Sequence, residues 1–499
     1  MANYDLNYKN LIMQGTTVLF PNCNNLILNL NWSRSNFASL SNLLLNSNLK
    51  NIQILNNKNL KYIDNMSYIF SGCYFLTALN TSNWNISNIS NARNMFCDCQ
   101  SLQNLDVSNW DISNIIDMSN TFFNCRNLIT LDVSNWNTNN VKSITVMFCN
   151  CYKLANLDVS NWNTSNVNNM YRTFFLCGNL NTLDVSNWDT SNVGNMDGMF
   201  YSCYNLKNLD VSNWNVSKVI NLDRMFFNCT NLINLNLSNW NTQNFYSIYG
   251  LFMWCRNLIN LNIENWNIKN VSDISSMFEG CYSLTNLNFS NWDVSNVKDM
   301  RSMFTDCINL TDLDISNWNV SNVCNIWYMF ENCVNLRNLK INTDWNLGQV
   351  DNICSLFNKC NNLVSLNLYN WNTSNLEDAT FTFAFCDRLT DLNLSNWNTQ
   401  KVNNVWYIFN NCKNLKNLNI ENWNLSNCSN VMMMFSYLNN LSNDSLKTIA
   451  KALSTANPYY KNLNNQNSFS PFYLSNKRLN TATIGSDLVS QLQSNGWIL

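Results

Sequence analysis

Cysteine, tryptophan and aspartate are the residues of this chain with the most chemical potential, and all three recur at a spacing of 26 residues. The 499 residues include 20 cysteines and 19 tryptophans but no histidine. Without histidine the chain lacks the commonest general base, the commonest metal ligand and the usual activator of a nucleophile. Carboxylate or lysine chemistry is still available, but no glycine-rich nucleotide-binding loop is present. The sequence therefore predicts that the protein is not an enzyme and has no catalytic residues.

The cysteine pattern favours packing over metal binding or disulfide formation. Cys73 and Cys99 are 26 residues apart, and the series continues with one thiol in each repeat. The repeat has no second regular cysteine column that could serve as a disulfide partner. The close pairs Cys97 with Cys99 and Cys149 with Cys151 lack the C-x-x-C spacing of zinc sites and have no histidine to assist them. We therefore expect buried, reduced thiols that behave as small apolar side chains, and neither a metal nor a cofactor.

The tryptophans, from Trp84 onward, keep the same step. Because rings at equivalent positions of stacked repeats can lie on one another, we expect them in the core and turns. A sugar-binding aromatic stripe is the alternative. Asparagines flank these tryptophans, as Asn109 precedes Trp110. We expect the asparagine columns to form side-chain ladders that satisfy backbone groups of the turns.

An acidic column is the best candidate for ligand binding. Leu105 and Val107 alternate with Asp106 and Ser108, so the polar pair is expected on the outer face of a strand. The candidate ligand-binding residues on this face are Asp106, Ser108, Asp132, Asp158, Asp184 and Asp210.

Three interpretations of the acidic column are open. Like charges about 5 Å apart repel unless they are solvated, hydrogen-bonded or bridged by a cation. The aspartates could form a solvated face and bond to neighbouring serines and asparagines, or they could contact a ligand. Calcium is less favoured, because one carboxylate per repeat does not supply the dense set of oxygens that Ca²⁺ prefers.

Each repeat predicts one strand and one helix. The spacing of Leu102, Leu105 and Val107 indicates a short strand with one buried face. Apolar residues then recur at three- and four-residue steps, which is typical of a short helix or of a few linked helical turns. These residues are Ile115, Met118, Phe122, Cys125 and Leu128. One copy cannot bury its apolar stripe alone, so about fourteen copies are expected to stack, strand on strand, at about 4.8 Å per copy.

The predicted fold is an α/β, leucine-rich-repeat-type solenoid with capped ends. Residues 1–63 are expected to form an N-terminal cap with a degenerate repeat at 23–32, residues 64–440 the solenoid, and residues 441–499 a C-terminal helical and loop cap. In this cap a helix is expected over 441–453, with Ser442 or Asn443 at its N-terminus. A second helix is expected from 486 to 495.

The repeat motif resembles a known family. Its unit, LDVSNWDTSNV from Leu183 to Val193, continues with Asn195, Met196, Met199, Phe200, Cys203 and Leu206. This unit resembles the leucine-rich repeat in general and the BspA-like bacterial surface-protein repeat in particular. The resemblance implies a solenoid used in adhesion to host proteins or surfaces. Similar repeats also occur in phage virion proteins, which is the alternative function.

Composition limits the partners and the location. Net charge is −2 and only 12% of residues are charged, so a nucleic-acid partner is not expected. No apolar run approaches the length of a membrane span, and no signal peptide is visible. The expected partner is a protein or glycan on a host surface, and the expected location is a cell surface or a virion surface. The oligomeric state is left open.

Overall fold

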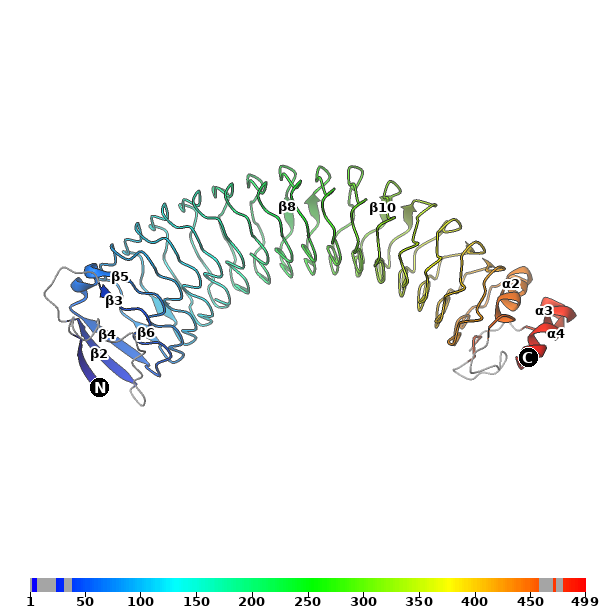
Figure 1. The fold of residues 1–499 in the computed structure, drawn as a ribbon, viewed down its shortest axis with the longest axis horizontal. Coiled ribbons are helices and arrows are strands. Elements are labelled where there is room, and N and C mark those ends of the chain that lie inside the picture. Colours follow the sequence, from blue (N-terminus) through cyan, green and yellow to red (C-terminus); the bar gives the residue numbers. More distant parts are fainter. Residues whose placement is uncertain (1, 7–23, 31–37, 457–469, 473–478) are drawn as a thin grey trace. The chain divides into compact units, whose positions relative to one another are not determined.

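The computed structural model describes residues 2–6, 24–30, 38–456, 470–472 and 479–499 (Figure 1). The chain divides into two compact units. Unit 1 contains Met1–Phe245 and Trp254–Asn262, and unit 2 contains Tyr246–Met253 and Ile263–Leu499. Within each unit the chain winds as a parallel solenoid in which one 26-residue repeat makes one coil. The predicted parallel solenoid is therefore confirmed.

Unit 1 contains short strands that pair only in parallel. The strands β1, β2, β4, β6 and β7 form one sheet in that order, and β3 pairs with β5 and β8 with β9. Their bounds, with one 3-10 helix, are β1 (Ala2–Leu6), β2 (Asn25–Leu30), β3 (Ala38–Ser39), β4 (Asn51–Leu55), η1 (Asn57–Tyr62), β5 (Ile63–Asn65), β6 (Ala78–Leu79), β7 (Asn104–Leu105), β8 (Asn234–Asn236) and β9 (Asn260–Asn262).

The parallel sheet of unit 1 begins inside the segment predicted as an N-terminal cap. Strand β2 pairs with β4, and β4 pairs with β6, so the ladder runs through the predicted boundary at residue 63. Of the degenerate repeat predicted at 23–32, residues 24–30 are described and contain β2, whereas Cys23 and Trp32 lie outside the described residues.

Unit 2 continues the same coil pattern and then becomes helical. The pairs β10 with β11 and β12 with β13 are parallel, with partners one repeat apart. The bounds in unit 2 are β10 (Asp312–Ile315), β11 (Asn338–Ile341), β12 (Asp391–Asn393), β13 (Asn417–Asn419), α2 (Asn443–Leu453), α3 (Thr481–Ile484) and α4 (Ser486–Ser494).

Stacked aromatic rings fill the coil interior. Phe122 and Phe148 have ring centroids 5.7 Å apart and planes 5° from parallel, and Trp136 and Trp162 are 6.1 Å apart at 8°. The Trp136 indole N–H donates to the Val107 carbonyl at 3.1 Å, so its one polar group is satisfied inside the core. The prediction of core tryptophans is confirmed, because these two side chains are 3% exposed.

The short helix predicted in each repeat is wrong. The segment from Met118 to Cys125 is a series of turns, in which the Met118 N–H donates to Ser143 of the next coil and the Thr121 N–H donates to Met118. Residue 120 in this segment has a φ of 57°, in the left-handed region that interrupts a helix. The backbone groups of this segment therefore bond to the next coil instead of along a helix.

The helices predicted at the C-terminal end are confirmed. The Ser442 hydroxyl accepts from the Ser445 N–H at 3.2 Å and so caps α2. After α4, Gly496 has a φ of 82°, and the Trp497 indole donates to the Leu453 carbonyl at 2.9 Å. None of the helices formed by the described residues is long and apolar enough to cross a bilayer.

Candidate functional site: the strand face

We call the solvent-facing side of the strands the strand face. In each coil it presents positions equivalent to Asn104, Asp106 and Ser108, while the intervening Leu105 and Val107 are 5% and 0% exposed. This alternation follows from the two-residue period of a strand. All five predicted aspartates are exposed on this face, and we name them the acidic row: Asp106, Asp132, Asp158, Asp184 and Asp210.

Each aspartate of the acidic row closes a local turn. Asp106 Oδ1 accepts from the Ser108 N–H at 3.2 Å and from the Ser108 hydroxyl at 2.7 Å. The same two bonds recur at the other four aspartates, with a hydroxyl distance of 2.7 Å each time. At Asp210 the Ser212 hydroxyl and N–H lower the carboxyl pKa below its usual value. The predicted bonding of aspartate to neighbouring serine is therefore confirmed.

The turn needs an oxygen atom and does not need a charge. Asn236 and Asn393 stand at the same position of other coils, and their side-chain oxygens accept from Ser238 and Ser395 in the same way. The negative charge of the acidic row is therefore not needed to form the turn. None of the ion pairs formed by described residues involves the acidic row, whose five aspartates are exposed.

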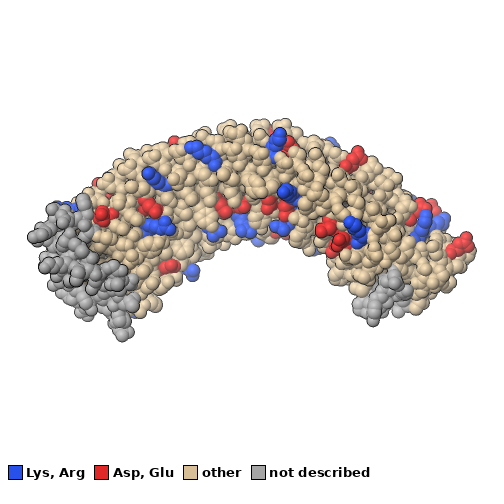
Figure 2. All heavy atoms as spheres, in the orientation of Figure 1, with Lys and Arg blue, Asp and Glu red and all other residues tan. Residues whose placement is uncertain are grey.

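A shallow depression lies along the acidic row in unit 1. Its volume is about 450 Å³, and it is lined by residues 104–106, 130–132 and 156–158. Three nearly buried leucines form its floor, and three aspartates stand along it. Charged side chains are sparse on the face shown in Figure 2, in keeping with the 12% of residues that are charged.

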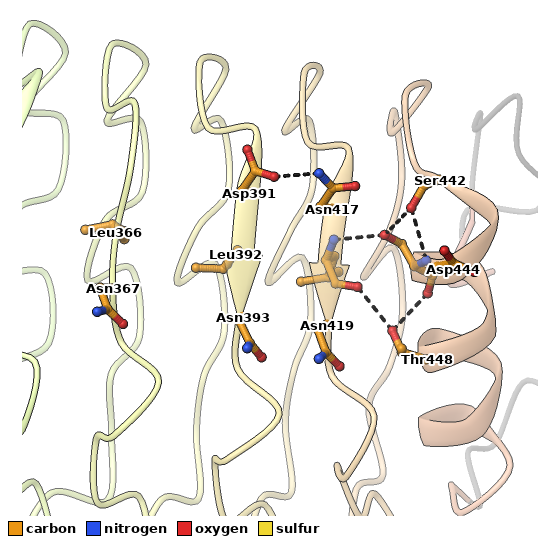
Figure 3. Close-up of a pocket in the computed structure, with 12 residues that line it drawn as sticks. Leu366, Asn367, Asp391, Leu392, Asn393, Asn417, Asn419, Ser442, Asp444 and Thr448 are labelled. Atoms are coloured by element: carbon orange, nitrogen blue, oxygen red, sulfur yellow. Dashed lines mark hydrogen bonds between the residues drawn. The ribbon is translucent and has the colours of Figure 1, made fainter.

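A second depression, of about 530 Å³, lies on the strand face of unit 2 where the sheet meets α2 (Figure 3). Residues of three coils line it, and the cap residue Ser442 with Asp444 and Thr448 of α2 closes one end. The sequence analysis missed this site, because its residues come from four segments between positions 366 and 448 and depend on where α2 docks.

The cysteines that recur every 26 residues are buried thiols of low reactivity. Cys125 is fully buried and its thiol donates to the Phe96 carbonyl at 3.1 Å, a bond to the preceding coil that recurs through the column. Burial raises the pKa of Cys125 well above its ordinary value and that of Cys229 to about 12. The described cysteines are free, as predicted. In the described part of the chain no group of three or more acidic or thiol side chains is arranged to hold a metal ion.

Asparagine side chains tie neighbouring coils together. The Asn114 amide donates to the Ser87 carbonyl, and the Asn140 amide to the Ser113 carbonyl, both at 2.7 Å. Equivalent bonds follow in later coils. This ladder satisfies turn carbonyls as predicted, but it runs through the asparagine four residues after each tryptophan. A residue that flanks the tryptophan, such as Asn137, instead accepts from a backbone N–H of its own turn. This ladder explains why asparagine recurs in phase, since a donor of this length is needed once per coil.

Comparison with known proteins places this repeat in a family. Five overlapping segments match one family model, described as Mycoplasma protein of unknown function, DUF285. The matched segments are residues 16–129, 117–235, 150–260, 247–362 and 335–449. The chain belongs to the DUF285 family. The DUF285 match establishes a repeat family, and the BspA-like name stays a resemblance of the motif.

Other comparisons with this DUF285 chain are more distant. No curated protein matches it. A leucine-rich-repeat protein from Bacteroides ovatus is 19% identical, with a TM-score of 0.31, over 55% of this chain and 75% of its own. One from Leptospira interrogans is 14% identical, with a TM-score of 0.21, over 80% and 90%. The functional domain of InlJ from Listeria monocytogenes is 13% identical, with a TM-score of 0.22, over 78% and 64%.

Proposed function

We propose that this DUF285 chain is a non-enzymatic binding scaffold whose strand face in unit 1 contacts a protein displayed on a host surface. One observation carries the proposal. Five consecutive coils keep a carboxylate at a position where Asn236 and Asn393 make the same turn without a charge. Since the fold does not require the charge, an external partner is the reason we assign to it.

Charge complementarity defines the partner. The acidic row leaves one carboxylate oxygen of each aspartate outside the turn, so lysine or arginine side chains of a partner could form charge-assisted hydrogen bonds there. The phosphates of a nucleic acid would be repelled by the same row. Repeat solenoids bind partners along such extended faces, where each coil adds one set of contacts. A protein with a basic patch fits this surface.

Display at a cell surface completes the proposal, with residues 1–63 and 441–499 as the terminal caps of the scaffold. The C-terminal cap is supported by its contacts: the Ser445 hydroxyl donates to the Lys416 carbonyl at 2.9 Å, and the Leu418 N–H donates to that same hydroxyl at 2.9 Å. Helix α2 thereby satisfies the backbone edge of the coil that precedes it. The phage virion role stays a prediction from the sequence, and copurification with phage particles would support it.

The test removes the charge and keeps the turn. Asp132→Asn, Asp158→Asn and Asp184→Asn are combined, because asparagine makes the same bonds at Asn236. Labelled protein is bound to intact animal cells and measured by flow cytometry, with and without trypsin treatment of the cells. If each charged contact contributes about 0.5–1 kcal/mol, the combined variant should bind roughly 10- to 100-fold more weakly. The triple change to lysine should abolish binding.

A matched control makes the same substitution elsewhere on the coil. Asp111, Asp189 and Asp293 are exposed and also accept from the backbone N–H two residues on, at 3.0, 2.9 and 3.0 Å. Their combined change to asparagine alters the net charge equally and should leave cell binding unchanged. Binding that survives trypsin, or that is equal in the two triple variants, would exclude a protein partner on the acidic row.

A further inference from the structure

The depression beside α2 contains a row of oriented amide donors. Asn367, Asn393 and Asn419 occupy the position of the acidic row in three successive coils of unit 2, and we call them the amide row. Figure 3 shows them side by side along one edge of the depression, with their amide groups oriented alike.

Backbone bonds set the orientation of these amides. Asn393 Oδ1 accepts from the Ser395 N–H at 3.1 Å, and Asn419 Oδ1 accepts from the Glu421 N–H at 3.1 Å. Asn367 Oδ1 accepts from a backbone N–H in the same way, at 3.4 Å. Because only the oxygen of an amide can accept, each NH₂ group points the other way with its two donors available. The described residues supply no acceptor for these three NH₂ groups.

The opposite edge of the depression presents acceptors. The Asp391 carboxylate accepts from the Asn417 amide and from the Thr390 hydroxyl, both at 2.5 Å, and these bonds lower its pKa. A carboxylate has about four acceptor sites, so two are left for a ligand. Asp444, at the start of α2, adds a second carboxylate and accepts from Lys447 at 3.1 Å. The two edges are therefore complementary in kind: donors on one and acceptors on the other.

The floor between the edges is apolar and the end is closed. Leu392 and Leu418 are 2% and 1% exposed and form the floor with Leu366. Helix α2 is held against the sheet at this point, since the Thr448 hydroxyl donates to the Leu418 carbonyl at 3.1 Å. A ligand here would place an apolar surface on the leucines and polar groups at both edges.

We propose that this depression binds a segment of a neutral glycan. Hydroxyl groups both donate and accept, as the two edges require, and sugar rings carry apolar C–H faces for the floor. An anionic ligand would be repelled by Asp391 and Asp444, and a cationic one would leave the amide row without acceptors. The donors repeat with the coils, about 4.8 Å apart, whereas same-side groups of an extended peptide repeat at about 6.7 Å. A peptide would therefore fall out of register within three coils.

This inference is independent of the proposed protein-binding function, because it concerns unit 2 and an uncharged row. The two can fail separately. The acidic row should not affect glycan binding, and the amide row should not affect binding to a basic protein.

The experiment uses the full chain and an array of neutral oligosaccharides, followed by calorimetric titration of the strongest binder. Asn393→Asp and Asn419→Asp are combined, since aspartate makes the same turn at Asp106 and the fold should survive. Each change replaces a donor by an acceptor, so the affinity should fall at least 10-fold. The matched control is Asn80→Asp with Asn236→Asp, which have the same turn in unit 1 and should change the affinity less than twofold.

Three results would overturn the proposal. The first is that no neutral oligosaccharide binds. The second is that one binds equally to the wild type and to the double variant. The third is that a neutral glycine–serine peptide binds and is lost in the double variant, which would assign the depression to peptides. Circular dichroism and the melting temperature establish that each variant is folded.

Discussion

Completing an interrupted buried amide ladder should stabilise unit 2. Residues 358, 384, 410 and 436 occupy equivalent positions in four successive coils. Asn358 and Asn410 are 6% and 2% exposed, yet the Asn358 side-chain oxygen and the Asn410 side-chain nitrogen have no hydrogen-bond partner. Ala384 stands between them, and the backbone bonds from Lys359 to Ala384 and from Phe385 to Asn410, both 2.8 Å, keep the coils in register.

The change Ala384→Asn fits the direction of the other ladders. Elsewhere the amide nitrogen of one coil donates to the side-chain oxygen of the preceding coil, as from Asn338 to Asp312 and from Asn260 to Asn234, both at 2.6 Å. Asparagine at position 384 would donate to the free oxygen of Asn358 and accept from the free nitrogen of Asn410.

The expected gain follows from the two groups that become satisfied. A net hydrogen bond contributes about 1 kcal/mol, and a buried unsatisfied group costs about 1–3 kcal/mol. Ordering the new side chain costs roughly 1 kcal/mol, so the free energy of unfolding should rise by about 1–2 kcal/mol. A rise of this size corresponds to about a 5- to 30-fold change in the ratio of folded to unfolded protein.

Urea unfolding and amide hydrogen exchange measure the effect. The urea midpoint should rise, and exchange of the Lys359 and Phe385 amides should slow by about the same 5- to 30-fold. Ala384→Leu is the control, because leucine has nearly the same shape as asparagine but cannot bond to either amide. A lower urea midpoint for Ala384→Asn than for the wild type, or equal effects of the two substitutions, would refute the reasoning.

Three further predictions concern turns, thiols and pH. Asp132→Asn should change the free energy of unfolding by less than about 0.5 kcal/mol, whereas Asp132→Ala should lower it by about 1 kcal/mol in urea unfolding, because only alanine loses the turn oxygen. With a thiol-reactive reagent at pH 8, half-buried Cys324 should be labelled before Cys229, whose pKa burial raises to about 12, as peptide mass spectrometry would show. Burial raises the pKa of Glu331, so the folded state binds its proton more tightly, and stability should fall as pH rises from the ordinary value of 4.5 through the raised folded value. Glu331→Gln should remove that loss, and its urea midpoint should exceed that of the wild type at pH 7 more than at pH 4.

Much of the candidate binding surface could be predicted because it repeats along one strand. The alternation of Leu105 and Val107 with Asp106 and Ser108 is enough to place the acidic row outside, and the structure places it there. The amide row could not be predicted in the same way. Its chemistry depends on whether the side-chain oxygen or the NH₂ group of Asn393 faces outward. The Ser395 N–H decides this, because it donates to the oxygen. The position of Thr448, which closes one end of the depression, depends on the docking of α2.

The sequence by itself determined the period, the core and the solvent-facing columns of this DUF285 chain. These follow from repetition, since stacking places equivalent residues such as Trp136 and Trp162 on one another whatever the details of the coil. Only the tertiary structure decided the conformation at the coil edge. There the three- and four-residue apolar spacing suggested a helix, but neighbouring coils compete for the same backbone groups. A bond from Met118 to Ser143 replaces the bond a helix would make, because the backbone groups of the two coils are close enough to pair.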